Sequence, residues 1–151
     1  MADIEIVTCL VTDENAHAYM VHRTDYDRLH LPGGRQLATK NEDGSYTTES
    51  PETAAARLLD TTLMITADPE FMREACVIET DLYGITTRAQ VLEVTRYAGN
   101  AVCMGFKNYD WGVFVDMQRR NLHRRLSPTA QRLWEMVHDN EVVLLPRDTV
   151  Q

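Results

Sequence analysis

The chain has 151 residues, of which 44% are hydrophobic and 25% are charged. These are the proportions of one globular domain, and they exclude a fibrous or largely disordered chain. The formal net charge of −8 repels polyanions and disfavours binding of nucleic acid over a broad surface, so a small anionic ligand in a local basic pocket is the better expectation.

The cysteines and the first residues both indicate a reducing compartment. Cys9, Cys76 and Cys103 are far apart, odd in number and without CxxC spacing, so we expect free thiols rather than a disulfide framework or a zinc site. The start, MADIEIVTCLVTDENAH, is acidic where a secretion signal is basic, and no apolar run is long enough to cross a bilayer. We predict a cytoplasmic protein without membrane contact.

The first third of the chain is predicted to be β-structure. Residues 4–12 are rich in β-branched side chains and residues 16–22 follow after a polar turn, so together they predict a hairpin. Residues 31–34, Leu-Pro-Gly-Gly, interrupt regular structure. The polar stretch 35–48, with a tight turn at Asp43-Gly44, predicts a projecting loop or a small β-arm.

Two helices are predicted from the same kind of start. Ser50-Pro51 and Ser127-Pro128 each combine a capping hydroxyl with a proline that fits the first helical turn. The first helix is expected to extend to about residue 62. The faces predicted to be buried have helical spacing and comprise Ala55, Leu58, Leu59 and Thr62 in the first helix and Ala130, Leu133, Trp134 and Val137 in the second.

The segment between the helices is predicted to be mainly strands. Residues 71–81 and 88–97 are joined by a turn at Tyr83-Gly84, and a further short strand is expected at 111–115. No repeat, low-complexity tract or linker divides the chain. We therefore predict a single domain, residues 1–151, of the α/β (α+β) class, with a mixed β-sheet sandwiched between helices.

Residues 31–65 read LPGGRQLATKNEDGSYTTESPETAAARLLDTTLMI, and this stretch resembles the loop, helix and loop signature of the Nudix hydrolases. The Leu-Pro-Gly-Gly run, the ESPE before the helix and Arg57, eight residues after Glu49, fall where the pattern of that family puts them. The loop between Gly34 and Glu49 is longer than is usual in the family. With its flanking elements, the resemblance covers nearly the whole chain and implies a Nudix-like fold.

The glutamates of that signature are missing. In the family, the arginine is followed by a glutamate, by two further glutamates after a gap of two residues, and by a glycine; here those positions hold Leu58, Thr61, Thr62 and Met64. Positions 58, 61 and 62 share one helix face. A leucine and two threonines do not replace three carboxylates around magnesium, a hard cation that requires charged oxygen ligands. We expect no metal at this site, no cofactor, and a lost or strongly reduced pyrophosphohydrolase activity.

The resemblance also implies where a ligand is held. The ligand-binding candidates are Gly33, Gly34, Arg35 and Arg57. Arg57 suits either direct phosphate contact or a structural role in holding the loop, and we favour the structural role. Glu49 and Glu52 are weak catalytic candidates, because negative side chains at a helix start are stabilised by the free amides and the helix dipole without any catalytic role.

Three groups of residues outside the signature bear on function. The first is the basic cluster, defined as Arg119, Arg120, His123, Arg124 and Arg125. Such a cluster contacts phosphate or a nucleic-acid strand in some proteins, but more often it is a solvated face or a partner surface. Tyr83, Tyr109 and Trp111 are candidates for stacking on a nucleobase, although packing is the commoner role of aromatic residues. The five histidines show no ligand spacing, so we predict no catalytic histidine.

Three functions remain open at this point, and with them the question whether the chain is an enzyme. The first is a Nudix-like domain that binds a nucleotide-type ligand or a protein partner and has lost metal-dependent hydrolysis. The second is an active hydrolase of a nucleoside diphosphate derivative, which binds Mg²⁺ through relocated carboxylates from among Glu42, Glu49, Glu52, Glu79 and Glu93. The third is a structural interaction module, such as one half of a homo-oligomer.

The three functions differ in what must lie near Gly34 and Arg57. An enzyme requires at least three converging oxygen ligands, a binder requires an open pocket with hydrogen-bond donors, and a structural module tolerates a pocket filled by Leu58, Leu63 or residues 35–48.

Overall fold

The computed structural model describes residues 2–103 and 109–148. In chain order the elements are β1 (Ile4–Val11), β2 (Ala18–Arg23), β3 (Leu29–His30), β4 (Gly33–Gly34), β5 (Ala38–Lys40), β6 (Tyr46–Thr48), α1 (Pro51–Leu63), β7 (Thr66–Ala67), the 3-10 helix η1 (Pro69–Phe71), β8 (Arg73–Leu82), β9 (Ile85–Val94), β10 (Tyr97–Ala98), β11 (Tyr109–Val115), the 3-10 helix η2 (Leu122–Arg125) and α2 (Pro128–His138). None of the described helices is long and apolar enough to span a bilayer.

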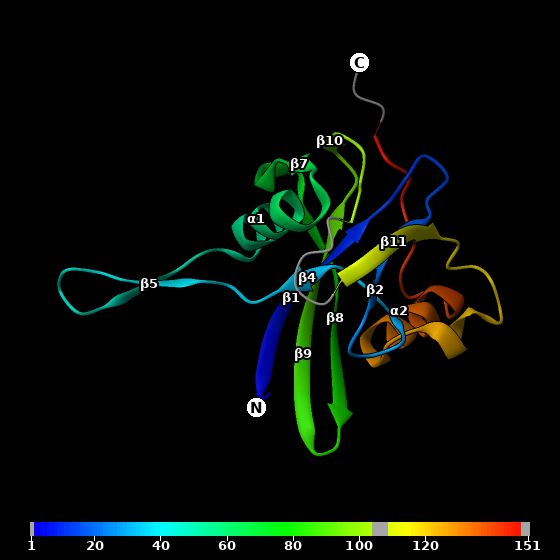
Figure 1. The fold of residues 1–151 in the computed structure, drawn as a ribbon, viewed down its shortest axis with the longest axis horizontal. Helices are drawn as coiled ribbons and strands as arrows, with labels where there is room; N and C mark the ends of the chain where they lie inside the picture. Colours follow the sequence, from blue (N-terminus) through cyan, green and yellow to red (C-terminus); the bar gives the residue numbers. More distant parts are fainter. Residues whose placement is uncertain (1, 104–108, 149–151) are drawn as a thin grey trace.

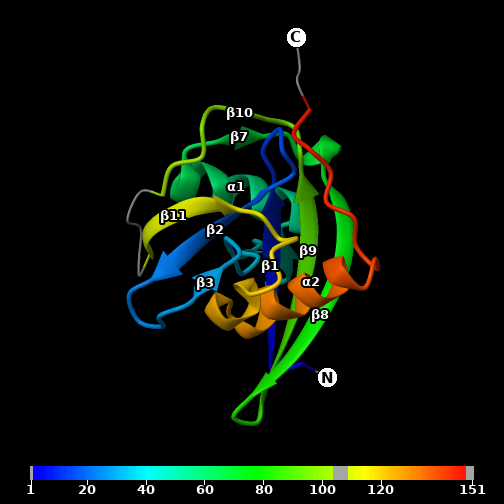
Figure 2. The ribbon, with the colours of Figure 1, turned by 90° about the vertical axis from the view of Figure 1, so that its right-hand side faces the viewer.

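The larger sheet is mixed and has the strand order β4-β1-β9-β8. β1 is parallel to β9, whereas β9 and β8 form the antiparallel hairpin that was predicted around the Tyr83-Gly84 turn. A second, antiparallel sheet has the order β11-β2-β3 and lies beside α2 (Figure 2). The predicted class, a mixed sheet with helices packed on it, is therefore confirmed.

The predicted hairpin of residues 4–22 is wrong. Both strands form, but β1 and β2 belong to different sheets, and the chain between them is closed by an antiparallel bridge between Thr12 and Ala18 and a backbone hydrogen bond from Asp13 to His17. The reason is the burial of β1, whose residues 7–11 are all buried. A strand covered on both faces pairs in the interior of a mixed sheet, where neighbouring strands lie on each side of it. Residues 33–34 also differ from expectation, because they pair with β1 as the short strand β4.

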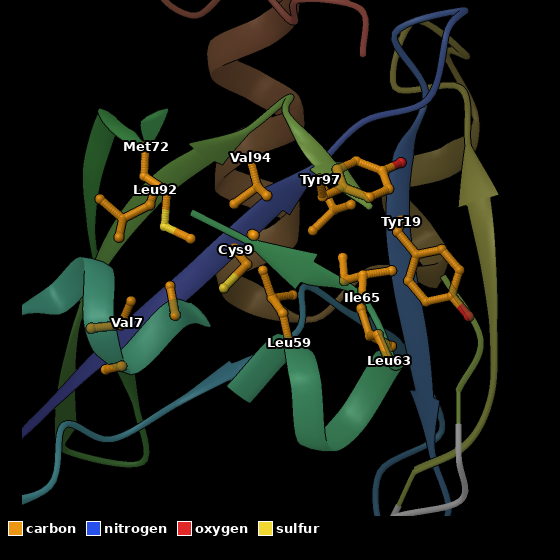
Figure 3. Close-up of a cluster of buried hydrophobic side chains, with 14 of the residues drawn as sticks. Val7, Cys9, Tyr19, Leu59, Leu63, Ile65, Met72, Leu92, Val94 and Tyr97 are labelled. Atoms are coloured by element: carbon orange, nitrogen blue, oxygen red, sulfur yellow. The ribbon is translucent and has the colours of Figure 1, made fainter. Parts of the chain in front are cut away.

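The helices α1 and α2 lie on opposite sides of the larger sheet (Figure 1). Successive side chains of a strand point to opposite faces, and β1 follows this rule. Cys9 packs with Leu59 and Leu63 of α1 (Figure 3), whereas the next residue, Leu10, is buried together with Leu133 of α2. The two apolar helix faces therefore cover the two faces of one sheet.

Both predicted helix starts are confirmed. Oγ of Ser50 accepts a hydrogen bond from the backbone N–H of Thr53, and Oγ of Ser127 accepts one from Ala130, which satisfies amide donors that the helix itself leaves free. α1 ends at Leu63 and is capped by Met64, whose φ of 57° lies in the left-handed region. Glycine is the residue favoured at such a position, and it is the residue that the Nudix signature has there.

The predicted β-arm is also confirmed. β5 and β6 form an antiparallel hairpin that extends well away from the helices and sheets (Figure 1), and all six of their residues are exposed. The turn between them is closed by a backbone hydrogen bond from Asn41 N–H to the Ser45 carbonyl oxygen at 2.7 Å. The three cysteines are free, as expected, and burial raises the pKa of the Cys9 thiol to about 12.

Candidate functional site

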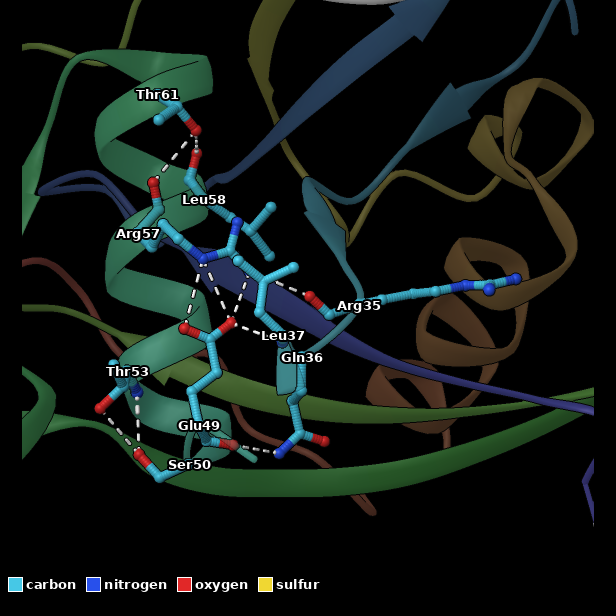
Figure 4. Close-up of polar contacts among 9 residues, drawn as sticks. All are labelled: Arg35, Gln36, Leu37, Glu49, Ser50, Thr53, Arg57, Leu58 and Thr61. Carbon is cyan, nitrogen blue, oxygen red and sulfur yellow. Dashed lines mark hydrogen bonds and ion pairs between the residues drawn. The ribbon is translucent and has the colours of Figure 1, made fainter. Parts of the chain in front are cut away.

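Glu49 and Arg57 join the base of the arm to α1 (Figure 4). Nη2 of Arg57 donates to Oε1 of Glu49 at 2.6 Å and to the carbonyl oxygen of Arg35 at 3.0 Å. Oε1 of Glu49 also accepts from the backbone N–H of Leu37 at 2.8 Å, and the Glu49 carbonyl oxygen accepts from Nε2 of Gln36. Both ends of the arm are thus fixed by one ion pair, in which the Arg57 guanidinium lowers the pKa of the Glu49 carboxyl below its usual 4.5.

The side chains of Arg35 and Glu52 take no part in that ion pair. The Arg35 side chain is exposed and points away from Glu49 and Arg57 (Figure 4). Glu52 lies in the first turn of α1, where a carboxylate is stabilised by the helix dipole. The Arg57 guanidinium binds Glu49 and the Arg35 carbonyl oxygen, as expected for a side chain that holds the arm in place.

Leu58 fills the space between α1 and Gly34. A Cβ atom on Gly34 would lie 3.0 Å from Cδ2 and 3.3 Å from Cδ1 of Leu58, and the Leu58 side chain belongs to the core, with 8% of the residue exposed. Thr61 and Thr62 both donate their hydroxyl protons to backbone carbonyls one turn earlier in α1, including that of Leu58. The face that carries glutamates in the family therefore holds one apolar contact and two hydroxyls bonded to the helix.

These residues do not fit a magnesium ion. Mg²⁺ requires near-octahedral coordination by oxygen ligands, with carboxylates the usual protein ligands, and the Leu58 side chain supplies no oxygen. In the part of the chain that the structure describes, no three His, Cys, Asp or Glu side chains converge as a metal site. The relocated carboxylates are scattered: Glu42 lies in the turn of the arm, Glu79 is exposed on β8, and Glu93 pairs with Arg73 at 3.2 Å.

A cavity of about 490 Å³, the central cavity, lies on the face of the larger sheet that carries α2. Its walls come from both sheets and from the start of α2, and they include Ile6, Thr8, Gly33, Gly34, Thr80 and Thr87 of the larger sheet, Arg23, Asp25, Tyr26, His30, Leu31 and Tyr109 from the β2–β3–β11 side, and Ser127, Pro128 and Thr129. A cavity of this volume is in the range that accommodates a small molecule. Of the predicted ligand-binding residues, Gly33 and Gly34 line the cavity, whereas Arg35 and Arg57 do not.

Close backbone contacts shape this cavity. A Cβ atom on Gly33 would lie 2.2 Å from the carbonyl oxygen of Val7, so glycine is required for this segment to lie against β1. On the other side, the backbone N–H of Ser127 donates to the carbonyl oxygen of Leu29 at 2.9 Å. This bond holds the start of α2 against β3.

His30 is the most distinctive polar group of the cavity wall. Its Nε2 atom is buried and has no hydrogen-bond partner, and burial lowers the pKa of its imidazole from 6.5 to about 4. The ring is therefore neutral at pH 7, and its Nε2 atom is covered by neighbouring protein atoms. Tyr26 lies edge-on to it, with the ring centroids 5.5 Å apart.

Other polar groups of the wall carry no net charge at pH 7. The Arg23 guanidinium donates two hydrogen bonds to Asp25, at 2.9 and 2.6 Å, and this ion pair lowers the pKa of the Asp25 carboxyl. Burial raises the pKa of the Tyr109 phenol, which keeps that hydroxyl protonated. The wall thus combines neutral hydrogen-bonding groups with an aromatic ring, a surface that suits a nucleobase or a sugar.

Sequence reasoning missed His30 and Arg23. His30 was set aside because the histidines lacked the spacing of metal ligands or of a catalytic triad, and neither pattern detects a histidine that acts by being neutral and buried. His30 directly precedes the Leu-Pro-Gly-Gly run in the sequence. Among the aromatic candidates, Tyr109 lines the cavity, Trp111 instead stacks on His22 with the centroids 4.8 Å apart, and Tyr83 is 95% exposed.

Neither a protein-family model nor a curated relative matches the sequence, but solved structures match the fold. The MutT protein from Methanosarcina mazei Go1 has a TM-score of 0.68 at 17% identity, over 91% of this chain and 94% of that chain. The MutT Nudix hydrolase from Burkholderia pseudomallei has a TM-score of 0.65 at 16% identity, over 87% and 96%. The Nudix domain of Shewanella oneidensis NrtR, complexed with ADP ribose, has a TM-score of 0.64 at 12% identity, over 94% and 90%. These similarities establish that the chain has a Nudix-like fold.

Proposed function

We propose that this chain is a cytoplasmic Nudix-like domain that binds a nucleotide-type small molecule in the central cavity and has lost metal-dependent hydrolysis at α1. The observation that carries the proposal is the packing of Leu58 on Gly34, with 8% of Leu58 exposed. With Leu58 at this position, the fold and the cavity remain intact, but no carboxylate faces the place of a metal ion. Ligand binding therefore persists without metal-dependent hydrolysis.

The chemistry of the cavity supports a nucleotide-type ligand. The hydroxyls of Thr80 and Thr87 and the phenol of Tyr109 provide both donors and acceptors along the wall of the cavity. Planar bases are recognised by such groups together with aromatic contact, which Tyr26 offers. The NrtR Nudix domain, which has the same fold, is complexed with ADP ribose, and a ligand of this class is in the size range of the cavity.

Isothermal calorimetry in buffer containing EDTA tests the proposal with nucleosides, nucleoside diphosphates and ADP-ribose. The informative variant is Thr87→Tyr, which inserts a ring into the cavity from β9. The matched control is Thr86→Tyr, which places the same ring at the neighbouring position, where the side chain points to the opposite face of the strand.

We expect at least one nucleoside or nucleotide to bind without metal, Thr87→Tyr to abolish that binding and Thr86→Tyr to preserve it. The proposal fails if none of the probes binds at millimolar concentration, or if Thr87→Tyr, folded by circular dichroism, binds as the unsubstituted protein does. Turnover that requires Mg²⁺ would instead support the active hydrolase with relocated carboxylates.

A second candidate function, self-association, is favoured by the arm. An isolated two-stranded hairpin is only marginally stable in water, and this one exposes Leu37 and Tyr46, the latter by 66%. Tyr46 shares one face of the hairpin with Ala38 and Lys40, and Leu37 belongs to the opposite face, so a second copy that contacts the arm on both faces would bury both side chains. Sedimentation analysis over a range of protein concentrations tests this function: we expect dimers that Leu37→Ser with Tyr46→Ser dissociates, and a monomer at every concentration contradicts it.

A further inference from the structure

The basic cluster does not act as one surface, because the fold divides it. His123 and Arg124 line a second cavity of about 440 Å³, the basic cavity, together with Tyr26, Arg28, Leu126, Pro128 and Gln131. Arg119 and Arg125 line a different hollow beside Trp111. Arg120 lines neither of them.

The basic cavity adjoins the central cavity. Tyr26 and Pro128 line both, so one ligand can contact both cavities by passing these two side chains. α2 begins at Pro128, between the two cavities, and the positive end of its dipole is directed toward the place where they meet. A ligand with a neutral part and an anionic part matches this arrangement.

The two arginines of the basic cavity, Arg28 and Arg124, form no ion pair with any Asp or Glu among residues 2–103 and 109–148. The acidic residues nearest to Arg28 in the sequence are already engaged, since Asp25 pairs with Arg23 at 2.6 Å and Asp27 with His22 at 2.7 Å. In a chain with a net charge of −8, arginines that form no ion pair around a cavity contribute a local positive potential for an anion.

The Arg28 guanidinium is also held in place. Its Nη1 donates to the carbonyl oxygen of Asp27 at 2.7 Å, and its remaining donors are available to a ligand. Arginine binds phosphate oxygens with paired, charge-assisted hydrogen bonds. The α1 face, by contrast, offers Leu58, Thr61 and Thr62, none of which carries a charge or leaves a hydroxyl proton free for a phosphate.

We infer that the basic cavity binds the phosphate end of the ligand, with Arg28 and Arg124 as the contacting residues and His123 beside them. The inference rests on the proposed function for the other end of the ligand, the base and sugar in the central cavity. The phosphates then lie at the start of α2, across the larger sheet from α1, and need no metal ion to offset their charge.

Calorimetry with three probes, a nucleoside, its diphosphate and inorganic pyrophosphate, tests the assignment in metal-free buffer at low and high salt. The variants are Arg28→Gln and Arg124→Gln, with Arg124→Lys as the conservative change. Arg120→Gln is the matched control, because it removes the same charge from the same basic cluster at a residue that lines neither cavity. Circular dichroism verifies that each variant is folded.

We expect the diphosphate to bind more tightly than the nucleoside and this advantage to shrink with salt. Arg28→Gln and Arg124→Gln are each expected to weaken diphosphate binding about tenfold, because each removes charge-assisted hydrogen bonds. Neither variant is expected to change nucleoside binding, and Arg120→Gln is expected to leave both affinities unchanged.

Two results would overturn the assignment while leaving the proposed function intact. One is equal affinity for nucleoside and diphosphate. The other is a loss of diphosphate affinity with Arg120→Gln as large as that with Arg124→Gln, which would indicate a long-range effect of the positive charge of the basic cluster rather than binding at a specific site. If pyrophosphate binds and Arg124→Gln removes it while no nucleoside or nucleotide binds, the anion site stands and the proposed function fails. Tighter binding of a single-stranded oligonucleotide than of the diphosphate overturns the small-ligand assignment.

Discussion

The contact between Leu58 and Gly34 predicts a specific pattern of stabilities in a double-mutant cycle. Leu58→Ala removes an apolar side chain of which 8% is exposed, and such truncations cost about 2–4 kcal/mol of unfolding free energy. Gly34→Ala places a methyl group 3.0 Å from Cδ2 of Leu58, a contact tight enough to cost roughly 1–2 kcal/mol by overpacking. In the double variant the added methyl meets a shortened side chain, so the second cost disappears.

The double variant is therefore expected to be no less stable than Leu58→Ala alone, with a coupling free energy of about 1–2 kcal/mol between the two sites. Urea unfolding followed by far-ultraviolet circular dichroism measures all four stabilities. A natural control is Thr61→Ala with Gly34→Ala, because Thr61 lies on the same face of α1 but bonds to the helix backbone. Additive losses for Leu58→Ala and Gly34→Ala would refute the view that Leu58 fills the space beside the glycine.

Three further predictions concern stability and pH. Glu49→Gln is expected to lower the unfolding free energy by about 1–2 kcal/mol, because it weakens charge-assisted bonds to Arg57, whereas Glu52→Gln in the same turn should change it little; urea unfolding of the two variants decides. Since the pKa of Glu49 is lowered in the folded state, the difference should be complete above pH 4.5 and disappear as pH falls through that lowered value. Met64→Gly should raise stability by roughly 0.5–1 kcal/mol, since Met64 has a φ of 57° and is 59% exposed, and an unchanged or lower melting temperature contradicts this. The pKa of His30 falls from 6.5 to about 4 on folding, so the unfolded chain binds more protons than the folded chain between these pH values. The free energy of unfolding should therefore decline by about 1–2 kcal/mol as the pH drops from 6.5 to 4, after allowance for the partial exposure of the ring. His30→Asn should flatten that decline, and an identical pH profile in the variant would contradict this prediction.

Local signals predicted those parts of the fold that depend on neighbouring residues. The Ser-Pro starts of α1 and α2 could be located because a capping hydroxyl and a proline act within one helical turn. The turn of the β8–β9 hairpin could be located at Tyr83-Gly84 for a similar reason. The hairpin of residues 4–22 failed because the partners of β1 are β9 and β4, which lie far along the chain, and no local pattern encodes that choice.

The candidate site also has features that the sequence could predict and features that it could not. That positions 58, 61 and 62 hold no carboxylate was visible in the sequence, and their place on one helix face is fixed by helix geometry. The packing of Leu58 on Gly34 was not, because it depends on how closely the glycine segment lies against α1. His30 could not be chosen either, as its burial and lowered pKa arise from elements that only the folded chain brings around it.

The most direct test of the central claim is a calorimetric titration of the protein with magnesium ions. We expect no saturable binding at micromolar concentration, because Leu58, Thr61 and Thr62 share one face of α1 and none of them carries a carboxylate. Saturable micromolar binding that is lost when one carboxylate, such as Glu49 or Glu52, is changed to glutamine would contradict the account and reveal a relocated metal site.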